Sequence, residues 1–212
     1  MTWNDLTVWQ FIQINKLSKE TGIDDFTKAQ KAVCIIYDKT ELELDRTKFR
    51  DYKQMETEAG KFLNEAIPVK RVRTIRAGKR RFRLESDLTK LEYRQYVEVL
   101  FFGKDPIENM HLVVASVVKP VNMFGIVKNN KVSDHKEVAE LLLNASVVDI
   151  HNACVFFCKL FMALIRSTKD YLVREIMSKS KMKKSEAEKL ITDSINTMGG
   201  FLQRPGLPNM KG

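Results

Sequence analysis

The sequence has little cysteine, proline or glycine: its 212 residues include three Cys, five Pro and nine Gly. So few cysteines exclude a small fold held together by disulfides, and we expect reduced thiols in a cytoplasmic protein. The glycines lack the spacing of a phosphate-binding loop, which argues against a nucleotide-dependent enzyme. With 44% apolar and 30% charged residues, the composition is typical of a soluble globular protein.

Long hydrophobic runs are also missing. The longest apolar stretch covers residues 153–165, is interrupted by Lys159, and at about 13 residues is too short to cross a bilayer. We therefore predict a buried helix there and no membrane partner. The N-terminus has no basic segment followed by an apolar one, so we expect no secretory signal.

Catalytic motifs are the next absence. Ser, His and Asp are present, but none of them lies in a nucleophile motif. Neighbouring carboxylates such as Asp24 and Asp25 fit helix caps better than an acid–base pair. We therefore expect no enzymatic activity and no cofactor.

One set of side chains has metal-ligand spacing in principle. His151, Cys154 and Cys158 share one face of a helix, and Cys34 or His111 would be the fourth ligand. Structural zinc sites, however, usually take paired ligands from a short loop as well as a helix. The flanking Val and Phe residues favour a core helix in which free Cys packs as a small hydrophobe. We predict no metal site.

Helix-start motifs divide most of the chain into helices. Thr7 and Gln10 form a capping box for a first helix, and a second is expected to begin at Asp24 or Asp25. A third follows Asp45, with apolar residues such as Phe49 at steps of three or four, and Pro68 ends it. Later helices are expected at residues 89–102, from 105 through the apolar stretch 111–118, and at 133–143, 146–179 and 185–199.

Between these helices, residues 69–84 change their period and contain no acid. Val72 and Thr74 alternate with arginines, as do Phe82 and Leu84, and Gly78 suits a turn with positive φ. We predict a β-hairpin with one apolar face on the body and one basic face outward. A lone hairpin is marginally stable, so it must pack on helices or join a partner's sheet. Its cations are the predicted partner-binding residues: Lys70, Arg71, Arg73, Arg76, Lys79, Arg80, Arg81 and Arg83.

These eight cations account for nearly all of the net charge of +9, since the chain has 36 basic and 27 acidic residues. Three interpretations stay open: a solvated face, a docking site for an acidic protein surface, or contact with nucleic-acid phosphates. The third is less favoured, because Phe82 is the one aromatic residue in the segment and single-strand binders use several.

The sequence thus predicts a mainly α protein of the α+β class, a helical bundle with one basic two-stranded hairpin inserted. We divide it into an N-terminal helical segment (1–68), the hairpin (69–84), a main helical domain (85–199) and an extended C-terminal tail (200–212). The tail has two prolines and no periodicity, which is typical of a disordered segment or of an arm on a neighbour. The candidate docking residues of the arm are Phe201, Leu202, Arg204 and Leu207.

A series of short motifs resembles one family of proteins. The motifs are Trp3-Asn4-Asp5-Leu6-Thr7 with Gln10-Phe11, Gly78-Lys79-Arg80-Arg81-Phe82, Asp87-Leu88-Thr89-Lys90-Leu91 with Tyr93 and Tyr96-Val97-Glu98, Asn109-Met110-His111-Leu112 before an apolar stretch that ends in Pro120, and Glu140-Leu141-Leu142-Leu143-Asn144-Ala145 with Phe156-Phe157. Over residues 1–178 the chain resembles small helical proteins encoded among the virion and tail genes of Bacteroidetes phages, including crAss-like phages. Those proteins are similar to tail assembly chaperones.

The resemblance implies non-enzymatic work in virion assembly in the host cytoplasm, with tail, portal or ring components as partners. A tail assembly chaperone masks adhesive surfaces of tail components until they polymerise, and the basic hairpin would complement an acidic partner. One alternative is a structural component of the mature virion, either a head–tail connector ring subunit or packaged cargo. The ring implies a homo-oligomer joined by strand addition at the hairpin. The other alternative is a nucleic-acid-binding accessory protein.

Overall fold

The computed structural model describes residues 1–212 except 88–89, 104, 123–124, 128–134, 180–182 and 204–212. Most of the described chain is helical, and it includes a small three-stranded antiparallel sheet, which confirms the predicted α+β class. The elements, in chain order, are α1 (Val8–Lys19), α2 (Asp25–Tyr37), α3 (Glu41–Asp45), α4 (Phe49–Asn64), β1 (Thr74–Ala77), β2 (Arg80–Leu84), α5 (Tyr93–Phe102), α6 (Met110–Ala115), β3 (Val118–Val121), α7 (His135–Leu143), α8 (Val147–Lys179) and α9 (Lys184–Gln203).

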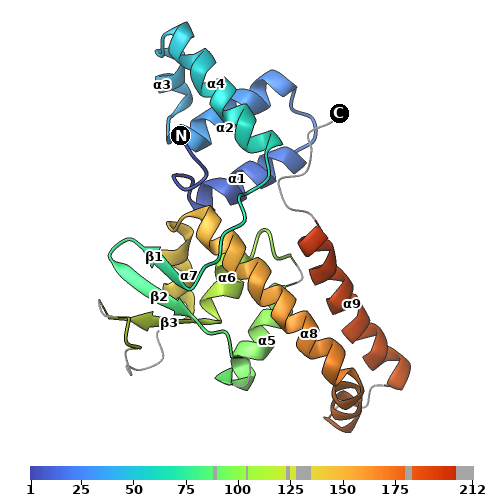
Figure 1. The fold of residues 1–212 in the computed structure, drawn as a ribbon. Coiled ribbons are helices and arrows are strands. Elements are labelled where there is room, and N and C mark those ends of the chain that lie inside the picture. Colours follow the sequence, from blue (N-terminus) through green and yellow to red (C-terminus); the bar gives the residue numbers. More distant parts are fainter. Residues whose placement is uncertain (88–89, 104, 123–124, 128–134, 180–182, 204–212) are drawn as a thin grey trace.

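The first four helices form one end of the molecule (Figure 1). α1 begins at the predicted capping box, in which the Gln10 N–H donates to Thr7 Oγ1 (3.2 Å) and the Thr7 N–H donates to Gln10 Oε1 (2.9 Å). The phenylalanines in the first turns of α2 and α4 are exposed, although the sequence placed Phe49 among the apolar residues of its helix. Phe26 and Phe49 are 61% and 75% exposed, respectively.

Helix α8 is the long central helix of the remaining part, and α9 runs beside it (Figure 1). It is continuous from Val147 to Lys179, close to the predicted range of 146–179. The predicted buried stretch lies within it, and Ala153, Phe157 and Phe161 are completely buried. By length and composition the segment Val147–Leu164 would also be able to cross a membrane, but 61% of it is buried inside the protein, as in a core helix.

Two backbone hydrogen bonds connect the start of α1 to the start of α8. The Val8 N–H donates to the Ala145 carbonyl (3.1 Å), and the Val147 N–H donates to the Leu6 carbonyl (2.9 Å). Both helices therefore begin at one contact. The N-terminal helices also share one continuous hydrophobic cluster with the sheet and with α8.

The segment after the hairpin differs most from the prediction. α5 begins at Tyr93 with Glu92 as its N-cap, whereas the predicted helix began at Thr89, which lies outside the described residues. The helix expected from residue 105 through residue 118 begins only at Met110 and ends at Ala115, and Val118, its expected last residue, is instead the first residue of β3. Hydrogen bonding to β2 explains this change, because a β-branched segment such as residues 117–121 fits a strand as well as a helix.

Candidate functional site

Polar side chains of α8 hold the segment that leads into the sheet. Asn152 is 9% exposed; its Nδ2 donates to the Pro68 carbonyl (2.9 Å), and its Oδ1 accepts from the Lys70 N–H (3.1 Å). The Lys70 ammonium also forms an ion pair with Asp149 (2.8 Å). Because Asp149 and Asn152 are about one helical turn apart, α8 fixes both the backbone and the side chain of Lys70 at the entrance to the hairpin.

The predicted hairpin is present, and its turn is short. Ala77 pairs with Arg80, so the turn consists of Gly78 and Lys79 alone. Gly78 has φ +57°, a left-handed conformation that glycine adopts without steric cost. A two-residue turn with positive φ at its first position is a common hairpin connection, since its twist matches that of the strands.

The two-residue turn fixes the register of the strands and so decides which side of β1 faces the core. The pairing sets Ile75 opposite Phe82, and these two side chains are 0% and 1% exposed. Thr74, which the sequence placed on the apolar face, is exposed instead. A shift of one residue in a strand moves every side chain to the other face, so the prediction for β1 was wrong by one position.

The outer face of the sheet collects cations from all three strands. Arg76 of β1, Arg81 and Arg83 of β2, and Lys119 of β3 share this face by strand alternation and register. We call these four residues the basic face. The sequence pattern predicted the three arginines but not Lys119, because β3 was not expected.

Two pairs of like charges lie directly opposite each other on the basic face. Arg76 is opposite Arg81, and Arg83 is opposite Lys119. Such pairs destabilise a sheet by roughly 0.2–1 kcal/mol each. Glu85 offsets part of this cost through its ion pair with Lys119 (3.0 Å). Burial acts to raise the pKa of Glu85, but hydrogen bonds from Lys119 and from the Asp87 backbone outweigh it and leave the pKa lowered.

Only two of the eight predicted cations have an acidic partner among the described residues: Lys70 pairs with Asp149, and Arg80 pairs with Glu137 (2.7 Å). Both partners of the Arg80 pair are about half exposed, so this pair contributes little to stability. Arg76 donates through Nε to the Gly78 carbonyl (3.3 Å). Within the described part of the chain, no acid lies within ion-pair distance of Arg71, Arg73, Arg76, Lys79, Arg81 and Arg83.

The one aromatic residue of the hairpin faces inward. Phe82 is buried in the hydrophobic cluster, so its ring is not available to stack on a base. The exposed aromatic side chains of the described chain lie on helices rather than on the sheet: Trp9, Phe26, Phe49, Phe101, Phe156 and Tyr171. The basic face therefore offers charge and hydrogen-bond donors without a stacking platform.

The predicted docking arm lies mostly beyond the described residues. α9 passes through Gly199 and Gly200 and ends at Gln203, so Phe201 and Leu202 are helical rather than extended. Arg204 and Leu207 belong to the part of the chain that is not described. Where the sequence indicated a stop at the two glycines, the helix continues for one more turn.

The residues weighed as metal ligands lie mainly in the core. Cys154 and Cys158 are completely buried, and a hydrogen bond between them, together with burial, raises the pKa of the Cys154 thiol. His151 is 8% exposed, and burial lowers its pKa to about 4. Across the described residues, no three or more His, Cys, Asp or Glu side chains are arranged to hold a metal.

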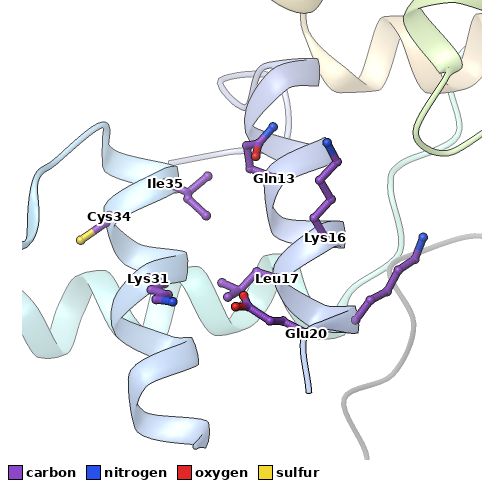
Figure 2. Close-up of a pocket in the computed structure, with 8 residues that line it drawn as sticks. Gln13, Lys16, Leu17, Glu20, Lys31, Cys34 and Ile35 are labelled. Carbon is purple, nitrogen blue, oxygen red and sulfur yellow. The ribbon is translucent and has the colours of Figure 1, made fainter. Parts of the chain in front are cut away.

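A groove of about 560 Å³ lies between α1 and α2 (Figure 2). Leu17 and Ile35 point into the space between the two helices, while Cys34 points away from α1. Burial and then the charges of nearby acids raise the pKa of Cys34, so this thiol is a poor nucleophile. Lys19, at the rim, is paired with Glu108 (2.9 Å).

Comparisons with known proteins identify no relative of this chain. No family model matches the sequence, and neither a curated protein nor a solved structure matches it significantly. The resemblance to phage tail assembly chaperones therefore depends on the sequence motifs alone.

Proposed function

We propose that this chain is a non-enzymatic assembly protein of a bacteriophage virion module, similar to tail assembly chaperones. It acts in the host cytoplasm and binds an acidic surface of another virion protein through its basic face. The phage assignment follows from the motif resemblance. The binding role is supported by one observation: arginines on adjacent strands face each other and no described acid neutralises them.

This arrangement favours binding over a merely solvated face. A solvated sheet face is more stable when opposite charges alternate across the strands, whereas here Arg76 faces Arg81. Carboxylates of an acidic partner placed beside these arginines would offset the repulsion between them, so binding would gain from the same charges that oppose folding. An acidic protein suits the face better than single-stranded nucleic acid does, because the hairpin's aromatic ring is buried.

Charge reversal on the basic face tests the proposal. We expect tagged protein to capture virion-module proteins from nuclease-treated lysate of infected cells, and Arg81→Glu/Arg83→Glu to reduce their recovery by about tenfold or more. A matched control is Arg46→Glu/Arg50→Glu, which makes the same charge change at exposed positions near the start of α4. Equal recovery of virion-module proteins with both double variants would overturn the proposal. Recovery of nucleic acid alone from untreated lysate would favour the accessory-protein alternative.

Particle composition separates a chaperone from a structural component. Quantitative mass spectrometry of purified particles and infected-cell lysate should find the protein abundant in the lysate and absent from particles. Many copies in each particle would replace the chaperone with a ring subunit or packaged cargo.

A further inference from the structure

Strand β1 forms one open edge of the sheet. The strand order is β1-β2-β3, so β1 has a neighbour on one side only. The Leu84 N–H donates to the Arg73 carbonyl (3.1 Å), which fixes the hydrogen-bonding phase of the ladder. Because hydrogen-bonded and non-hydrogen-bonded pairs alternate in antiparallel strands, Thr74 and Arg76 belong to the non-hydrogen-bonded pairs. Their backbone N–H and C=O groups therefore point away from β2.

These edge groups have no partner in the described structure. Both residues are exposed, and no described group hydrogen-bonds to the backbone of Thr74 or Arg76. The opposite edge of the sheet differs, since β3 contains Pro120, which has no N–H, and Val121 forms a bridge with Val127. Of the two edges, β1 is the one that offers consecutive outward donors and acceptors.

Charge decides which kind of strand fits this edge. Arg71 and Arg73 precede β1, Arg76 lies within it, and Arg81 stands next to Arg76 on the outer face. A second copy of β1 would bring further arginines against these, so self-pairing is opposed by like charge. An extended segment with an acid at every second residue would place its carboxylates on the outer face beside Arg76 and Arg81. Its intervening residues would lie on the side of Ile75 and Ala77, both buried, and would be apolar.

We propose that β1 accepts an extended acidic segment of the partner as a fourth strand, with acidic and apolar residues alternating. This inference rests on the proposed function, because it specifies how the partner of the basic face is held. The backbone groups of Thr74 and Arg76 provide the hydrogen bonds, and the arginines select the acidic side chains.

A pair of peptides and a proline variant test the inference. The probe is an alternating Val-Glu octapeptide, blocked at both ends; the reference peptide has the same composition in two blocks, four Val and then four Glu. We expect the alternating peptide to bind about tenfold more tightly than the reference peptide. Thr74→Pro should weaken binding of the alternating peptide by about the same factor, because it deletes an outward N–H donor and its ring blocks close approach of the added strand. Thr74→Val keeps the N–H and should bind as the unchanged protein does. Hydrogen exchange at the Thr74 and Arg76 amides should slow when the alternating peptide is bound.

The outcomes separate strand addition from the proposed function. If both peptides bind equally and Thr74→Pro has no effect, but Arg81→Glu/Arg83→Glu abolishes binding, strand addition is wrong and docking by charge alone survives. If no variant changes binding, or neither peptide binds, strand addition is overturned, and the lysate experiment then decides the proposed function independently. A concentration-dependent dimer that Thr74→Pro abolishes would identify a second copy as the occupant and also overturn the inference.

Far-ultraviolet circular dichroism and the urea midpoint must match between Thr74→Pro and Thr74→Val, because Thr74→Pro leaves the ladder to β2 intact.

Discussion

The two faces of the sheet are made from alternate residues of the same strands, yet their surroundings are opposite. On the inner face, Ile75, Ala77, Phe82 and Leu84 are between 0% and 8% exposed and belong to the hydrophobic cluster. On the outer face, arginines stand opposite arginine or lysine. Burial of the inner face stabilises the sheet, and this stabilisation offsets the repulsion between like charges on the outer face. Two cross-strand pairs of like charge on this face are better explained by binding than by folding.

The largest effect should come from removing the largest inner side chain. Phe82→Ala should lower the free energy of unfolding by about 3–5 kcal/mol, because it deletes a fully buried aromatic ring and leaves a cavity. The urea midpoint measures this loss. Arg83→Ala, one residue away on the outer face, is the matched control and should change stability by less than about 0.5 kcal/mol. Equal losses would mean that the two faces do not differ in their contribution to folding.

Acid should destabilise the protein through its buried histidines. Burial lowers the pKa of His111 and His151 from 6.5 to about 4, with a smaller contribution to His111 from the charge of His135. Above pH 6.5 both imidazoles are neutral in the folded and unfolded chains, so stability is unaffected. As the pH falls from 6.5 towards 4, the two histidines bind protons in the unfolded chain but stay mostly neutral in the folded chain. The free energy of unfolding therefore falls.

The expected loss from His151 is about 2 kcal/mol between pH 7.5 and pH 5, with a smaller part from the less buried His111. Urea unfolding at the two pH values measures the change. His151→Gln removes the titration and should flatten much of the pH dependence. A pH profile that this substitution leaves unchanged would assign the acid sensitivity to other groups.

The helices were predictable wherever local chemistry sets their ends. The Thr7–Gln10 box fixed the start of α1, and the apolar stretch within residues 146–179 identified α8, because caps and periodicity act over a few neighbouring residues. β3 was not predictable in this way. Its residues have an ambiguous local preference, and pairing with β2, more than 30 positions earlier, decides their structure.

The candidate site was predicted by composition but not by geometry. The absence of acids in residues 69–84 identified its arginines, and Gly78 marked the turn. The pattern did not determine the face of Thr74, because Val72-Arg73-Thr74-Ile75 alternates equally well in either phase until the turn length is known. Nor did it identify Asn152 as an anchor, since that contact joins residues 82 and 84 positions apart.

The smallest predicted effect addresses the cost of the outer face directly. Arg81→Thr removes one member of the Arg76–Arg81 pair and keeps a residue that favours strands. We expect stability to rise by about 0.5 kcal/mol at low ionic strength, and this gain to shrink in 0.5 M salt as the repulsion is screened. Arg71→Thr is the control, because it removes the same charge from an exposed position outside the strands.

A gain at Arg81 that disappears in salt, combined with lost capture of the partner, would show that the same side chain opposes folding and supports binding. A loss of stability in Arg81→Thr would indicate instead that the aliphatic part of Arg81 packs on the sheet. The cost of the outer face would then be smaller than its cross-strand charges suggest, and the case for binding would depend on the lysate and peptide experiments alone.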